Sequence, residues 1–160
     1  MMACMVYLAL SGFSLFLAGR ITPKEWFHPD QFPFRPFAFE KNGRLYHCLH
    51  IRLWQGRVPD MSRILPALIP QKKLTQDFRQ QLPAMVRETC VAEWTHFLLC
   101  LTGFYCLKLW KGTGGLVFSL LNLLVNSAYI VIQRFNRPRL MGLLEHTAQK
   151  SCLEERTCVS

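Results

Sequence analysis

The sequence predicts an all-α fold: a small polytopic membrane protein with about three transmembrane helices and interfacial amphipathic helices in the 20–90 loop. Three observations lead to this class. The 160 residues are 51% hydrophobic and only 18% charged, whereas roughly 25% charge is usual in soluble domains. The apolar residues gather in three long blocks. Because the length suits one domain, we expect a single membrane-embedded domain over residues 1–160.

The first apolar block covers residues 1–19 and is uncharged until Arg20. It is just long enough to cross a bilayer, which takes about 17–25 residues. We interpret it as a transmembrane helix or signal anchor, since a secretory signal carries its positive charge ahead of the apolar core. Cleavage after Ala18 or Gly19 is the alternative.

The second and third blocks, residues 83–110 and 115–133, are predicted to form a helical hairpin. The second opens on Pro83, a favourable first helical residue, and is long enough to project beyond the bilayer core. The two blocks are joined by the segment Lys111–Gly115, whose last residue already opens the third block. A connection this short makes neighbouring helices antiparallel.

The basic residues predict the orientation. Twelve Lys or Arg residues lie in segment 20–90, five follow residue 133, and two flank the hairpin turn. By the positive-inside rule, the 20–82 loop and the 134–160 tail are cytoplasmic, and the N-terminus is outside. We exclude nucleic acid as a partner, because these residues are dispersed rather than gathered in one stripe.

The 20–82 loop is broken by prolines and carries the aromatic residues typical of a membrane interface. Its pieces 43–55 and 72–82 place apolar residues at helical spacing, so we expect both to lie flat on the cytoplasmic surface. The seven cysteines form no C-x-x-C pair and are interpreted as reduced thiols that pack as small apolar residues.

Two ionisable residues lie inside the second span. Glu93 and His96 are three apart and share a helical face with Thr89, Cys100 and Gly103. Such groups cost at least about 2.5–3.5 kcal/mol in a membrane and are usually functional or paired. Glu93 is expected to fix the tautomer of the His96 ring and raise its basicity, which suits a general base acting on a hydroxyl. The alternative is a helix-end pair that bonds a neighbour at the interface.

A polar seam follows one face of the third span, at spacings of three and four: Ser119, Asn122, Asn126, Tyr129, Gln133 and Asn136. Amides of this kind associate transmembrane helices with about 0.6 kcal/mol each on average. We favour that structural role for Asn122 and Asn126.

The seam leads into the segment 133–140, where Pro138 disfavours helix at the preceding residue. We therefore expect the span to end there in a turn, level with Glu88 and His96. Arginine is suited to binding phosphate or carboxylate. Arg137 and Arg139 are expected to bind a ligand, and Arg134 to anchor the helix at lipid phosphates.

Five segments resemble, in order and spacing, the glycosyl-4,4'-diaponeurosporenoate acyltransferases of bacterial staphyloxanthin-type carotenoid synthesis: Phe39–Tyr46, Ile51–Trp54, Glu88–His96, Asn126 and Gln133–Leu140. The resemblance covers roughly residues 20–140. It implies a bacterial cell-membrane enzyme that esterifies a fatty acyl group onto the sugar hydroxyl of a glycosylated C30 carotenoid, as the final step. The acyl donor would be a thioester, acyl-CoA or acyl-carrier protein, with no cofactor. The other partners would be the bilayer and other carotenoid-pathway enzymes.

On this resemblance we assign hypothetical roles. His96 is the base, Glu93 orients it, and Glu88 joins them as a carboxylate for sugar hydroxyls. The substrate- and donor-binding candidates are Gln133, Asn136, Arg137, Arg139, Glu40, Arg52 and Trp54. Among these, Asn136, Gln133 or Arg137 would bind the developing oxyanion of the acyl carbonyl, and the arginines would hold phosphates of the donor.

Two other classes of function stay open. One is a non-catalytic scaffold or carotenoid-presenting subunit, which makes no ester. The other is a metal enzyme that joins Glu93-x-x-His96 to His47-x-x-His50, as in di-iron bundles. The His47-x-x-His50 pair does not supply the second Glu-x-x-His that such a bundle needs, and the resemblance does not run through that pair, so we expect no metal. Common acyltransferase motifs, His followed five positions later by Asp and G-x-S-x-G, are absent.

Overall fold

The computed structural model describes residues 1–58 and 78–159. In these ranges it describes every side chain except those of residues 24, 41–44, 47, 78–79 and 151–159. Within them, every regular element is an α-helix or a 3-10 helix. Three helices are long and apolar enough to cross a membrane, in the segments Met2–Ile21, Gln80–Leu109 and Thr113–Lys150. The prediction of an all-helical protein with three candidate spans is confirmed.

The chain divides into two compact units. The first consists of Met1–Arg35 and Arg87–Arg134, and the second of Pro36–Val86 and Phe135–Ser160. The first unit therefore holds the N-terminal helix and most of the helical hairpin, together with Glu93 and His96.

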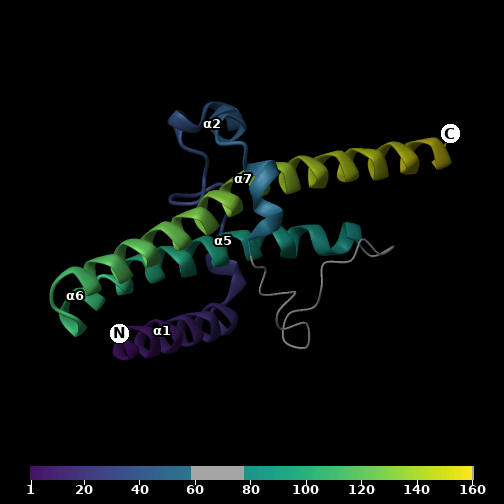
Figure 1. Ribbon diagram of the computed structural model, residues 1–160. Helices are drawn as coiled ribbons and strands as arrows, with labels where there is room; N and C mark the ends of the chain where they lie inside the picture. Colours follow the sequence, from purple (N-terminus) through teal and green to yellow (C-terminus); the bar gives the residue numbers. More distant parts are fainter. Residues whose placement is uncertain (59–77, 160) are drawn as a thin grey trace. The chain divides into compact units, whose positions relative to one another are not determined.

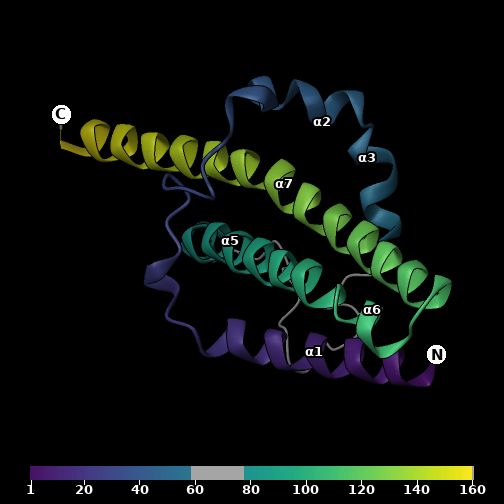
Figure 2. The same cartoon turned by 90° about the vertical axis from the view of Figure 1, so that its left-hand side faces the viewer.

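The described part of the first unit is built around three long helices. Helix α1 (Met2–Ile21) lies beside α5 (Phe78–Gly103), whose other side carries α7 (Thr113–Val159), as Figures 1 and 2 show for the parts of these helices in this unit. Tyr7 Oη donates to Thr102 O at 3.0 Å, and Gly19 approaches Val91 at the opposite end. Helix α1 is therefore antiparallel to α5.

The second span differs from the predicted single helix over 83–110 in two ways. It begins earlier in the chain, and it is interrupted near its end. Helix α5 begins at Phe78, and Pro83 lies inside it. It ends at Gly103, where Phe104 N and Tyr105 N donate to carbonyls three residues back. Such tight bonding is common at helix ends. A separate short helix, α6 (Cys106–Leu109), follows.

The predicted hairpin turn is present between α6 and α7. Gly112 adopts φ of 93°, a conformation that side-chain-bearing residues rarely take. At Gly115, a Cβ would collide with the carbonyl oxygens of Trp110 and Cys106. Glycine at these two positions therefore allows α7 to fold back closely on the end of the second span.

Helix α7 continues through Pro138 to Val159, so the prediction of a turn at Arg137–Pro138 is wrong. Proline lacks the N–H that would bond the carbonyl four residues earlier, which here belongs to Arg134. Proline disfavours helix at the preceding residue without excluding it, and the helical residues on both sides hold the conformation.

The segment after α1 folds back onto α5 within the first unit. It contains the 3-10 helix η1 (Lys24–Trp26), and its Phe27 and Phe34 are buried together with Cys90, with Val91 packed against them. The two phenylalanine rings are 5.7 Å apart. This packing holds the backbone of residues 33–35 beside the hairpin.

The second unit contains only short helices in its first described part: η2 (Ala38–Gly43), α2 (Arg44–Cys48), α3 (Ile51–Trp54) and η3 (Gln55–Arg57). His50, in the left-handed region at φ of 49°, separates α2 from α3, so the predicted helix over 43–55 forms in two pieces. Tyr46 packs edge-on against Phe135 of α7, with ring centroids 6.0 Å apart.

The other predicted interfacial helix, over 72–82, lies largely outside the described residues, and its last five positions belong to α5. The five cysteines with described side chains are free thiols, as predicted, at positions 4, 48, 90, 100 and 106.

Candidate functional site

The polar seam of α7 faces the polar side of α5, as the spacing of both predicts. Ser119 Oγ donates to Gly103 O at 3.0 Å, and Asn122 Nδ2 donates to Leu99 O at 2.8 Å. A Cβ at Gly103 would collide with the Asn122 amide. The two helices therefore approach closely here, and backbone carbonyls of α5 accept the side-chain hydrogen bonds of α7.

His96 lies further along the same polar side of α5. Its Nδ1 is 2.9 Å from Asn126 Oδ1. The ring stacks on Tyr129, with centroids 4.5 Å apart and planes within 3°. Two α7 residues thus hold one α5 imidazole, by an edge contact and by a face contact.

Asn126 is itself held within α7. Its Nδ2 donates to Asn122 O at 2.8 Å and to Asn122 Oδ1 at 3.0 Å, and its side chain is buried. From the sequence, Asn126 was predicted to associate the two helices, and Glu93 was predicted to orient the His96 ring. In the structure, the hydrogen-bond partner of His96 Nδ1 is Asn126.

Glu93 pairs with Arg134 instead. Arg134 Nη1 lies 2.5 Å from Glu93 Oε1, and both side chains are 9% exposed. The guanidinium also donates from Nη1 to Pro33 O at 3.1 Å and from Nη2 to Arg35 O at 3.0 Å. The expectation that Arg134 is a lipid-facing anchor is therefore wrong, because its charge and its donors are used inside the protein.

The remaining predicted site residues are divided between the two units. Glu88 is exposed on α5 and Gln133 is half-buried on α7, both in the first unit. The others are in the second unit: Asn136, Arg137, Arg139, Glu40, Arg52 and Trp54. Their gathering around His96 stays a prediction.

Within the second unit these side chains differ widely in exposure. Glu40 and Arg137 are 3% and 2% exposed, and Arg52 is exposed. Arg139 lies over the Phe135 ring at 5.2 Å, and Trp54 Nε1 donates to Leu49 O at 3.0 Å. Because α7 continues as a helix, Arg137 and Arg139 belong to it rather than to a terminal turn.

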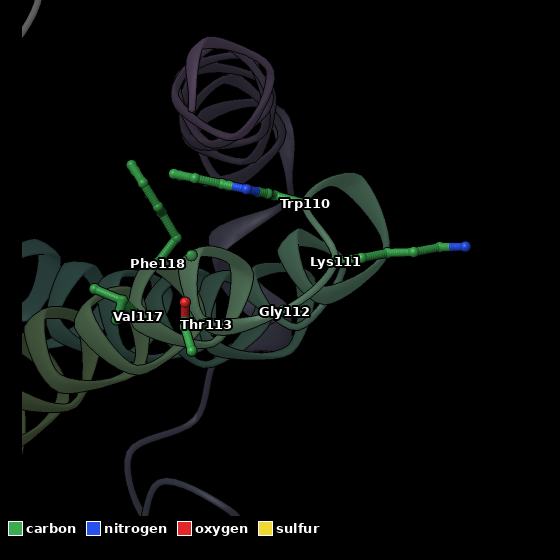
Figure 3. A pocket seen from close by; sticks show the side chains of 7 residues that line it. Trp110, Lys111, Gly112, Thr113, Val117 and Phe118 are labelled. Carbon is green, nitrogen blue, oxygen red and sulfur yellow. The ribbon is translucent and has the colours of Figure 1, made fainter.

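An open hollow of about 400 Å³ lies at the turn between α6 and α7, lined by Trp110, Lys111, Gly112, Thr113, Gly114, Val117 and Phe118. Figure 3 shows Trp110 and Phe118 on one side and Lys111 extending away from them; the two rings are 5.9 Å apart. The lining contains neither a carboxylate nor an imidazole, so it lacks the groups of the His96 site.

Among the described side chains, no group of three His, Cys, Asp or Glu residues is arranged to hold a metal ion. The side chain of His47, a member of the metal-site alternative, lies outside the described set.

The arrangement around His96 suits proton transfer. An imidazole fixed at one nitrogen and on one face keeps its other nitrogen in a constant direction, and a positioned base can take a proton from a hydroxyl in the transition state. The helices around it present mainly apolar residues outward, such as Leu120, Leu124 and Phe97. Such a site would serve a substrate dissolved in the bilayer.

Comparisons with known proteins agree on one family. The family model described as glycosyl-4,4'-diaponeurosporenoate acyltransferase matches residues 23–146. The glycosyl-4,4'-diaponeurosporenoate acyltransferase of Staphylococcus aureus strain MRSA252 is 26% identical over 146 residues, which cover 88% of this chain and 86% of that protein. The same-named protein of strain Newman is 25% identical over 152 residues, covering 92% and 89%. No solved structure matches the chain.

Proposed function

We propose a function from one premise: the chain belongs to the glycosyl-4,4'-diaponeurosporenoate acyltransferase family. The proposed reaction is the transfer of a fatty acyl group from a thioester donor to a sugar hydroxyl of a glycosylated C30 carotenoid. The polyene of the acceptor would lie in the bilayer among the apolar helices. Its sugar would lie near the polar seam of α7 and the polar side of α5 that faces it.

The proposed chemistry uses His96 as a general base and acid. The acceptor hydroxyl loses its proton to the imidazole while its oxygen bonds to the acyl carbon. The carbon–sulfur bond of the thioester then breaks, and the leaving thiolate takes the proton back from the imidazolium. The products are an ester and a free thiol, so protons and electrons balance without a cofactor.

One observation carries the assignment of His96. The imidazole lies between two apolar helices, bonded at Nδ1 to Asn126 and stacked on Tyr129. Ionisable side chains inside spans are rare and are usually functional. The Glu93 carboxylate is paired with Arg134, which favours a structural role for Glu93 and leaves proton transfer to His96.

The finer substrate assignments rest on the sequence and the family. Gln133, one helical turn beyond Tyr129, is proposed to bind the acyl oxyanion, and Glu88 to bind sugar hydroxyls. Asn136, Arg137, Arg139, Glu40, Arg52 and Trp54 are proposed for the donor and the sugar. We also retain the orientation with the N-terminus outside and the tail cytoplasmic, which would suit a donor that arrives from the cytosol.

The test expresses the protein in a host that makes the glycosylated carotenoid and measures esterified pigment by mass spectrometry. Wild type should yield the acyl ester, and His96→Ala should lower the yield by about 10²–10⁴-fold, the usual contribution of a positioned acid–base group. The exposed His28 provides a matched control, because His28→Ala should leave the yield unchanged.

Membrane content of each variant is measured by immunoblot and by gel filtration of the solubilised protein. Full ester yield from correctly inserted His96→Ala would refute the base assignment. Absence of ester from wild type, with precursor and donor present, would favour the scaffold alternative.

A further inference from the structure

We infer that Asn126 is a positioning residue that holds His96 as the tautomer protonated at Nδ1, which makes Nε2 the nitrogen that accepts the substrate proton. This inference rests on the proposed function, since it specifies which atom of His96 acts. It goes beyond helix association, the role that spacing alone suggests for Asn126.

A short chain of hydrogen bonds runs from the Leu99 carbonyl through Asn122 and Asn126 to His96. The Leu99 carbonyl oxygen can only accept, so the Asn122 group 2.8 Å away must be the amide nitrogen. That fixes the orientation of the Asn122 amide, and its Oδ1 faces Asn126. The Leu99 carbonyl therefore determines which end of the Asn122 amide is the nitrogen and which is the oxygen.

The second amide is fixed by two acceptors. The Asn126 nitrogen lies 2.8 Å from the Asn122 carbonyl oxygen and 3.0 Å from Asn122 Oδ1. Neither oxygen can donate, so the NH₂ end of Asn126 must face Asn122. Its Oδ1 therefore faces His96, and a flipped amide would place oxygen against oxygen.

The tautomer of His96 follows from that orientation. Asn126 Oδ1 accepts only, so the 2.9 Å contact with His96 Nδ1 requires the hydrogen on Nδ1. A neutral imidazole carries one N–H, and the other nitrogen keeps its lone pair. Nε2 is then the basic atom, and the stacked Tyr129 ring keeps the plane of that lone pair constant.

The same contact also serves the charged state. When Nε2 takes a proton, Nδ1–H remains bonded to the amide oxygen, so the imidazolium needs no rearrangement. Preorganisation of this kind favours proton transfer, because the partner is already in place when the charge develops.

The direct test is ¹⁵N NMR of protein labelled at histidine nitrogens, purified in detergent. The His96 resonances are assigned by their loss in His96→Asn. In wild type, Nδ1 should carry the hydrogen and Nε2 should show the shift of an unprotonated nitrogen. Asn126→Leu, similar in size but without an acceptor, should give a mixture of tautomers. Asn126→Asp, whose protonated carboxyl keeps one donor for Asn122 and one acceptor for His96, should retain the Nδ1–H form.

Kinetics with the glycosylated carotenoid and an acyl thioester give the second readout. Asn126→Leu should lower kcat by about 10–100-fold, the usual cost of losing a group that orients a functional histidine, with little change in KM. Asn126→Asp should recover part of the loss. His96→Asn keeps an N–H near the Nδ1 position for Asn126 and removes the base, so it should fold and be inactive.

The outcomes separate the two proposals. A wild-type His96 with its hydrogen on Nε2, or an unchanged tautomer in Asn126→Leu, overturns the role of Asn126 while the base assignment stands. Full activity of His96→Asn overturns the base assignment itself. If Asn126→Leu does not fold, the wild-type and Asn126→Asp spectra still decide the tautomer.

Discussion

Arg134 of α7 and Glu93 of α5 form a buried ion pair, and the same guanidinium donates to the carbonyls of Pro33 and Arg35. One side chain thus connects both helices of the hairpin to the segment that follows α1. The pair explains how a carboxylate is accommodated in a candidate membrane span, because its charge is compensated and its partner is bonded elsewhere too.

Arg134→Met should destabilise the protein by about 3–5 kcal/mol, the usual effect of removing one partner from a buried pair. It removes the guanidinium from the Glu93 carboxylate and two donors from the carbonyls of Pro33 and Arg35. Thermal unfolding of detergent-solubilised protein measures the change. Arg87, exposed on α5, provides the comparison: Arg87→Met should unfold near the wild-type temperature. Equal stability of the two variants would contradict the role of Arg134.

Gly103→Ala should loosen the contact between α5 and α7. The added methyl would collide with the Asn122 amide, and overpacking of this kind costs about 1–3 kcal/mol. The amide would be pushed away from Leu99 O, so ester yield should fall as well. Gly12→Ala on α1, where the Cβ meets nothing within 4 Å, is the control and should be neutral or slightly stabilising. A neutral Gly103→Ala would exclude the close approach.

Tyr129→Leu should lower both stability and ester yield, because it removes the ring that stacks on His96. A stacked aromatic pair contributes about 0.5–1.5 kcal/mol beyond its buried area. Tyr129→Phe keeps the ring and should stay closer to wild type in kcat. Equal loss of kcat in both variants would assign the effect to the hydroxyl instead of the stacking.

Single cysteines at Thr113 and Lys150, in a background with the native cysteines replaced, test the proposed orientation. An impermeant maleimide applied to intact cells should label Thr113→Cys and leave Lys150→Cys unlabelled until the membrane is opened. The basis is the excess of basic residues in the loop and the tail. The reverse labelling pattern would place the hairpin turn in the cytoplasm and invert the proposed topology.

Periodicity predicted much of the first unit. Thr89, Glu93, His96, Cys100 and Gly103 recur at three- and four-residue steps, and Thr89, Glu93, Cys100 and Gly103 are buried. The seam beginning with Ser119 does contact that face. The short link between the spans predicted the antiparallel pairing, because five residues allow no other path.

Local rules failed at three points. Pro138 disfavours helix at its neighbour, yet α7 continues past it. The run of apolar spacing over 43–55 predicts one helix, whereas His50 divides it. Arg134 follows an uncharged span and therefore reads as a lipid anchor, but carbonyls 99 and 101 positions earlier in the chain accept its hydrogen bonds.

The sequence by itself determined that three apolar segments exist and which side of the second and third spans is polar, because hydropathy and helical period are properties of neighbouring residues. Only the tertiary structure decided that His96 is bonded to Asn126 and that Glu93 is paired with Arg134. These partners are 30 and 41 positions apart. Which of them meet depends on how far each helix is turned and shifted against the other, and that is set by close contacts such as Gly103 with Asn122.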